Sequence, residues 1–97
     1  MPLSLLSSSL DWDKVRLFYT AAEAGSFTHA GDSLGLSQSA VSRQVGALER
    51  DLAVPLFHRH ARGLILTEQG ELLFRTAKEM MLKLEATRAR LTDSRER

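Results

Sequence analysis

Apolar side chains in residues 11–24 recur at the spacing of an α-helix. Val15, Phe18 and Ala22 follow one another at steps of three and four, so they share one face and predict an amphipathic helix. Gly25 follows this pattern directly and is expected to end the helix.

Two further helices are predicted between residues 26 and 52, with a turn at Gly35 between them. Ser26 is expected to cap a short helix over residues 27–34, because its hydroxyl accepts a hydrogen bond from an otherwise unpaired first-turn N–H group. Ser37 is expected to cap the next helix, which ends at Leu52. The apolar stripe of that helix consists of Ala40, Val41, Val45, Leu48 and Leu52. Two short helices joined by such a turn form the helix-turn-helix pattern.

The helical period stops at Pro55. Two short apolar runs follow, Leu56–Arg59 and Leu64–Leu66, and a tip of four residues separates them. This arrangement predicts a small two-stranded hairpin, or wing.

A long helix is predicted from residue 68 to about residue 90, capped by Thr67. Its residues at alternating steps of four and three form a seam: Leu73, Ala77, Met80, Leu84, Thr87 and Leu91. Leu72 and Phe74 give the same helix a second apolar face. One face can cover the preceding domain, and we expect the seam to bind a second copy of the chain as a homodimer.

The expected fold is therefore mainly α: a winged helix-turn-helix of three helices and a small β wing, followed by a long dimerisation helix. We expect a flexible arm over residues 1–10, the winged domain over residues 11–67, the long helix over residues 68–91 and a frayed tail over residues 92–97. No apolar run approaches the roughly 20 residues that a membrane span requires, and residues 1–10 lack the basic start of a secretory signal, which favours a soluble, cytoplasmic protein.

Charge is unevenly distributed, although the net charge is only +1. Residues 11–36 carry two more acidic than basic side chains, and residues 37–67 carry two more basic than acidic ones. The middle of the chain is thus the part suited to a polyanionic partner.

The polar face of the third helix carries the side chains that recognise base edges. Glutamine pairs with adenine, arginine with guanine, and serine donates or accepts in the major groove of duplex DNA. The candidate base contacts are Gln38, Ser39, Ser42 and Arg43. The candidate phosphate contacts are Thr28, Ser37, Gln44, Arg59 and Thr67. Arg62, beside Gly63 at the hairpin tip, is the candidate for the minor groove.

These residues also allow other interpretations. The polar face could be merely solvated, or the wing and third helix could form a protein-interaction module, which is the main alternative function. His58 and His60 lack the further ligands that a zinc site requires, so we expect no metal. No cysteine is present, and no serine has a nucleophile elbow or a paired base, so we expect no catalytic residue and no enzyme activity.

Several blocks in fixed order resemble the N-terminal domain of LysR-type transcriptional regulators. These blocks are Gly25–Thr28, Leu36–Gln44, Leu48–Glu49, Val54–Arg59 and Leu66–Gly70. The resemblance implies that the long helices of two subunits pair antiparallel and place two recognition helices on an interrupted palindrome in a promoter. It also implies that Gln38, Ser39, Ser42 and Arg43 meet bases or adjacent phosphates and that Arg62 enters the minor groove. Members of the family carry a C-terminal domain that senses a small-molecule inducer, and full-length members could form tetramers. We therefore expect no cofactor in this chain.

Two positions depart from the family pattern. Gly31 stands where alanine is usual, which lowers the helix propensity of the second helix by up to about 1 kcal/mol. Ser39 stands where proline is common, so a hydroxyl replaces an apolar ring.

Overall fold

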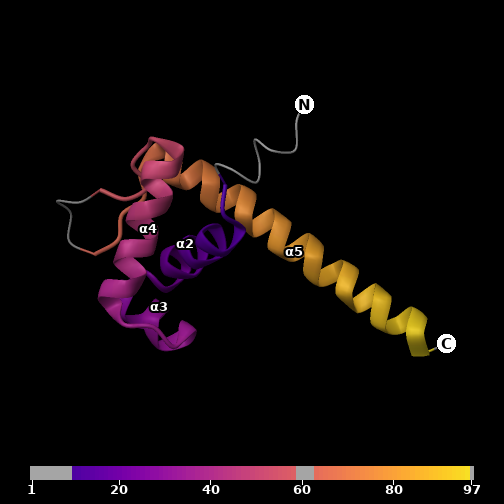
Figure 1. Cartoon of the computed structure of the whole chain (residues 1–97). Helices are drawn as coiled ribbons and strands as arrows, with labels where there is room; N and C mark the ends of the chain where they lie inside the picture. The colour runs from indigo at the N-terminus through magenta and orange to yellow at the C-terminus, as the bar shows by residue number, and fades with distance from the viewer. Residues whose placement is uncertain (1–9, 59–62, 97) are drawn as a thin grey trace.

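Within the residues that the structure describes, four helices form, and they agree with the four predicted from the sequence. In the computed structural model they are α2 (Trp12–Ala24), α3 (Phe27–Leu34), α4 (Gln38–Leu52) and α5 (Glu68–Glu96). The structure describes residues 10–58 and 63–96. Helices α2, α3 and α4 form a compact bundle, and α5 leaves this bundle as a long projecting rod (Figure 1).

Predicted local signals set the starts of α3 and α4 and the ends of α2 and α3. Ser26 Oγ accepts hydrogen bonds from the first-turn amides of α3, and Ser37 Oγ accepts one from the first turn of α4. Gly25 and Gly35 end α2 and α3 in the left-handed conformation, at φ 73° and 70°. A side chain at such a φ is strained, whereas glycine adopts it freely. The start of α2 is capped by the carboxylate of Asp11.

The core lies where α2 packs against α3, α4 and the start of α5. The Phe57 ring meets Phe18 at 5.4 Å between centroids and Phe27 edge-on at 5.8 Å, which joins the wing base to the helices. The fully enclosed large side chains are Phe18, Phe57, Leu48, Leu56, Val41 and Val45. The predicted apolar stripe of α4 therefore supplies half of them.

Gly31 has a steric function in the turn between α3 and α4. A Cβ atom placed on it would lie 2.4 Å from the carbonyl oxygen of Leu36. The Leu36 amide also donates to the Gly31 carbonyl at 2.9 Å, so the chain folds back directly onto this residue. The loss of helix propensity at Gly31 is thus accompanied by a close approach of the turn backbone at Leu36 to α3.

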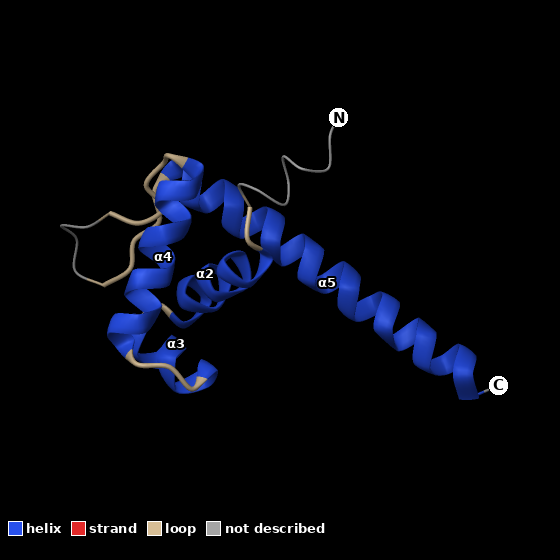
Figure 2. Ribbon diagram, in the orientation of Figure 1, coloured by secondary structure: helices blue, strands red, loops and turns tan. Residues whose placement is uncertain are grey.

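The predicted two-stranded wing is reduced to one bridge in the described residues. Phe57 and Leu66 form an isolated antiparallel bridge, and neither predicted run forms a strand in the part that the structure covers (Figure 2). The His58 amide donates to Ile65 at 2.8 Å, and the Thr67 amide donates to the Leu56 carbonyl at 3.0 Å. Residues 59–62, which include most of the tip predicted at residues 60–63, lie outside the described residues, as does most of the predicted arm.

Helix α5 is longer than predicted. It continues to Glu96, so residues 92–96 of the tail expected to be frayed are helical. Ala77 is the last of its residues to be fully buried, and beyond this point the helix runs away from the bundle (Figure 1). Near its start, Gly70 allows close contact with the wing base, because a Cβ there would lie 2.1 Å from the Leu56 carbonyl oxygen.

Candidate DNA-binding surface

The first two turns of α4 present a row of polar side chains outward. Gln38, Ser39 and Arg43 are exposed, and Ser42 is half-buried. The opposite face of α4 is fixed in the core by its buried valines and Leu48, so the orientation of the polar row is rigidly determined. The structure therefore brings all four predicted base-contacting residues together on one accessible stretch of helix.

Three residues that the sequence predicts to contact phosphates, Ser37, Gln44 and Thr28, are also accessible. Ser37 and Gln44 are exposed at the start and middle of α4, and Thr28 is exposed on the first turn of α3. The Ser37 and Ser39 hydroxyl oxygens lie 3.4 Å apart, which places the cap residue beside the row. Helix α3 packs directly on α4, so Thr28 is carried by an element that contacts α4.

Thr67 does not belong to this surface, contrary to the sequence-based prediction of a phosphate contact. Only 6% of the residue is exposed. Its hydroxyl donates to the Pro55 carbonyl at 2.7 Å and accepts from the Gly70 amide at 2.9 Å. Thr67 instead joins the start of α5 to the loop before the wing, while its predicted role as the cap of α5 is confirmed.

Arg59 and Arg62, the predicted phosphate and minor-groove contacts of the wing, lie outside the described residues. The wing base that would carry them is fixed to α4 by Glu49. Its carboxylate accepts hydrogen bonds from the amides of Leu56 at 2.7 Å and Phe57 at 3.3 Å. Sequence reasoning missed this role of Glu49, because the pattern of α4 shows a charge on its surface but not the backbone amides that it meets.

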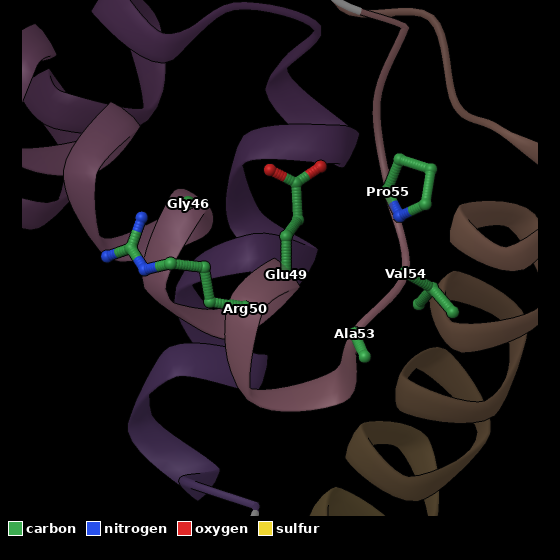
Figure 3. A pocket seen from close by; sticks show the side chains of 6 residues that line it. All are labelled: Gly46, Glu49, Arg50, Ala53, Val54 and Pro55. Atoms are coloured by element: carbon green, nitrogen blue, oxygen red, sulfur yellow. The ribbon is translucent and has the colours of Figure 1, made fainter.

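An open groove of about 410 Å³ separates the second half of α4 from the loop that leads to the wing. It is lined by Gly46, Glu49, Arg50, Ala53, Val54 and Pro55 (Figure 3). The carboxylate of Glu49 extends toward the chain at Pro55, whereas the guanidinium of Arg50 lies on the other side, next to Gly46 (Figure 3). Gly46 and Arg50 are not among the residues predicted from the sequence to contact DNA.

The predicted dimerisation seam on α5 is divided into two parts. Ala77 is 1% exposed within the single chain, so the expectation that it contacts a second chain is wrong. Leu73 is half-buried against the core, which also limits its access. Met80, Leu84 and Leu91 remain 43%, 57% and 67% exposed. Met80 and Leu84, together with Lys83 and Thr87, line a shallow hollow of about 250 Å³.

Ionisable groups with shifted pKa values lie away from the polar row of α4. Desolvation, followed by a hydrogen bond to Glu23, raises the pKa of the Tyr19 phenol on α2. On distal α5, hydrogen bonding to Arg88 lowers the pKa of the Glu85 carboxyl and raises that of the Arg88 guanidinium. These pairs stabilise helices locally and take no part in the candidate surface.

The described residues contain no group of three or more side chains suited to hold a metal ion, and His60 of the predicted HxH pair lies outside them. No helix within the described ranges is long and apolar enough to cross a membrane.

Comparison with known proteins identifies the architecture. The family model described as bacterial regulatory helix-turn-helix protein, lysR family, matches residues 12–71. Among curated proteins, the chain is 38% identical to the HTH-type transcriptional activator BauR of Pseudomonas aeruginosa over 86 residues, which are 89% of this chain and 28% of BauR. It is 45% identical to the regulator AbaB of Streptomyces antibioticus over 85 residues, which are 87% of this chain and 28% of AbaB.

Solved structures give the same result. The complex of the BenM DNA-binding domain with benA site 1 DNA matches with a TM-score of 0.79 and 26% identity, covering 87% of this chain and 94% of that one. Full-length AphB, a virulence activator of Vibrio cholerae, matches with a TM-score of 0.74 and 31% identity. The match covers 87% of this chain and 29% of the AphB chain. The chain thus spans less than a third of BauR, AbaB and AphB. The chain belongs to the LysR family of bacterial regulatory helix-turn-helix proteins and forms the helix-turn-helix domain of that family.

Proposed function

We propose that this chain binds duplex DNA sequence-specifically, with the first two turns of α4 in the major groove. The observation that carries the proposal is the row of exposed donors and acceptors on those turns, held in place by a buried opposite face. In this arrangement Gln38 pairs with an adenine edge and Arg43 with a guanine edge, while Ser39 and Ser42 contact neighbouring bases.

Phosphate contacts around the groove fix the register of α4 on the DNA. We assign them to Thr28 and Ser37 at two helix starts, where amide dipoles also favour an anion, and to Gln44. Arg59 and Arg62 complete the proposal on sequence grounds, with Arg62 in the minor groove beside the wing. Thr67 is not included, because its hydroxyl is engaged inside the protein.

A homodimer built through α5 would place two α4 helices on one interrupted palindrome. Support comes from the exposed apolar side chains of Met80, Leu84 and Leu91, which a second copy would cover. In the whole protein we expect a further C-terminal domain to sense a small inducer and the dimers to associate into tetramers. Such a protein acts where the chromosome lies, in the cytoplasm, and carries no catalytic site in this domain.

The test is selection from a pool of random duplexes by the purified chain at about 0.15 M salt, where non-specific phosphate binding is weaker than at low salt. We expect enrichment of a two-fold symmetric site. The Arg43→Ala variant is expected to bind that site about 1 to 3 kcal/mol more weakly and to relax its sequence at one base pair in each half. A folded chain that enriches no sequence would reject the proposal and favour the protein-interaction module.

A further inference from the structure

Arg50 lies on the same face of α4 as Ser39 and Arg43, two of the residues assigned to base contacts, but farther along the helix. At 3.6 residues per turn, positions 39, 43, 46 and 50 of a helix fall within about 60° of one another. Arg50 is exposed, and its Cα lies about 10 Å along the axis from that of Arg43 at 1.5 Å per residue. Since the major groove is about 12 Å wide, a residue at this distance from a base contact reaches the edge of the groove, where the phosphates are.

The side chain of Arg50 is directed back toward Gly46, about one turn earlier in α4. A Cβ atom built on Gly46 would find only one neighbour within 4 Å, the Arg50 Nη1 atom at 3.6 Å. The guanidinium therefore lies over the position where a side chain at residue 46 would be. Because Gly46 has none, the groove between α4 and the wing loop stays open on this side (Figure 3).

The charge of Arg50 is not neutralised by the acids beside it in the sequence. Glu49 points to the wing base, where its carboxylate binds two backbone amides. Asp51 pairs with Lys14 of α2 at 3.1 Å. Among the residues that the structure describes, no carboxylate forms an ion pair with Arg50. The open end of the groove thus presents a positive charge that lacks a protein partner in the described chain.

We propose that Gly46 and Arg50 bind the DNA backbone: a phosphate enters over Gly46 and is held by the guanidinium of Arg50. The inference rests on the proposed function and adds a contact to it, at the edge of the groove opposite to the start of α4. The contact positions α4 without reading sequence, since phosphates are the same at every base pair.

The test compares Arg50→Gln with a matched control, Arg90→Gln. Both variants lose one positive charge from an exposed helical position, but Arg90 lies on the distal part of α5, far from α4 (Figure 1). Dissociation constants are measured by fluorescence anisotropy on the selected duplex and on a duplex of unrelated sequence. Circular dichroism checks that both variants keep the helical content of the wild type.

The logarithm of the binding constant falls linearly with the logarithm of the salt concentration, and each phosphate contact contributes about 0.9 to that slope. A dimer that loses the Arg50 contact in both subunits therefore has a slope that is smaller by about 1.8. The affinity deficit of Arg50→Gln is therefore expected to be about 12-fold larger at about 0.05 M than at about 0.2 M salt, and similar on both duplexes. Arg90→Gln is expected to leave the slope unchanged. Equal behaviour of the two variants would overturn the inference, as would a deficit confined to the selected duplex. If the wild type binds neither duplex, the proposed function itself fails.

Discussion

Substitution of Gly70 by alanine tests how the start of α5 holds the wing base. In an isolated helix, Gly→Ala stabilises by about 0.8 to 1 kcal/mol, because glycine loses more backbone entropy on folding. At Gly70 the new Cβ would lie 2.1 Å from the Leu56 carbonyl oxygen and 3.0 Å from Leu66 Cδ2. The first distance is about 1.3 Å short of the 3.4 Å at which ordinary contacts begin.

The obstacle is backbone, so it cannot yield by a change of rotamer. Relief requires the Leu56 carbonyl to move, and this oxygen accepts the hydrogen bond from the Thr67 amide that closes the wing base. Overpacking costs about 1 to 3 kcal/mol and an unpaired buried backbone group about 1 to 3 kcal/mol more. After the propensity gain is deducted, we expect Gly70→Ala to lower the free energy of unfolding by about 1 to 5 kcal/mol.

Gly46→Ala is the matched control, because both glycines lie inside helices. Its Cβ would meet only Arg50 Nη1, at an ordinary 3.6 Å. This variant is therefore expected to gain up to about 1 kcal/mol in stability, the opposite sign. The free energy of unfolding of both variants is measured by urea unfolding, followed by far-UV circular dichroism and by the fluorescence of the single tryptophan, Trp12. If Gly70→Ala proves as stable as the wild type, the close packing of α5 on the wing base would be refuted.

Three further predictions concern the wing base, the exposed apolar face of α5 and the Glu85–Arg88 ion pair on that helix. Glu49→Ala removes the acceptor of two wing-base amides and is expected to cost about 1 to 3 kcal/mol in urea unfolding, whereas Glu49→Gln, which keeps an acceptor, should cost less. Leu84→Lys is expected to shift the chain toward monomer in sedimentation velocity, while Leu82→Lys, a similarly exposed change on the opposite side of α5, leaves the association unchanged. The Glu85 carboxyl is expected to titrate below its ordinary 4.5 in carbon NMR, with its helix contribution present above that pH and lost as pH falls through the lowered pKa. Arg88→Gln should return the pKa toward 4.5, and an unchanged value would show that the pair does not form in solution.

Features that depend on neighbours along the chain were predictable. Ser26 and Ser37 cap helices through amides two or three residues away, and Gly25 and Gly35 end helices through their own backbone conformation. All four therefore appear in the sequence as local signals. The polar row of α4 was predictable for the same reason, because the side opposite an apolar stripe must face outward.

Features that depend on distant partners were missed or misjudged. Thr67 looked like a surface hydroxyl, but the Pro55 carbonyl, which binds it, is twelve residues away. Ala77 fits the heptad seam, but the spacing of apolar residues is the same whether the helix bundle or a second chain covers them. In the structure the helix bundle of the same chain buries Ala77. The wing was predicted as two strands from its apolar runs, yet in the described residues these runs form one bridge, and the side chains of Glu49 and Thr67 add hydrogen bonds to the backbone of residues 55–57.

The division of α4 into a buried and an exposed face bears on how binding specificity changes in such a domain. The buried face, with Val41, Val45 and Leu48, fixes the helix axis against α2 and α3. Exposed residues away from caps and buried contacts usually alter stability by less than about 0.5 kcal/mol when replaced. Substitutions at Gln38 or Arg43 are therefore expected to change the DNA sequence that is bound while leaving the fold intact. Glu49 differs from these residues, because its carboxylate links α4 to the wing base, and its replacement is expected to alter the placement of the wing base relative to α4.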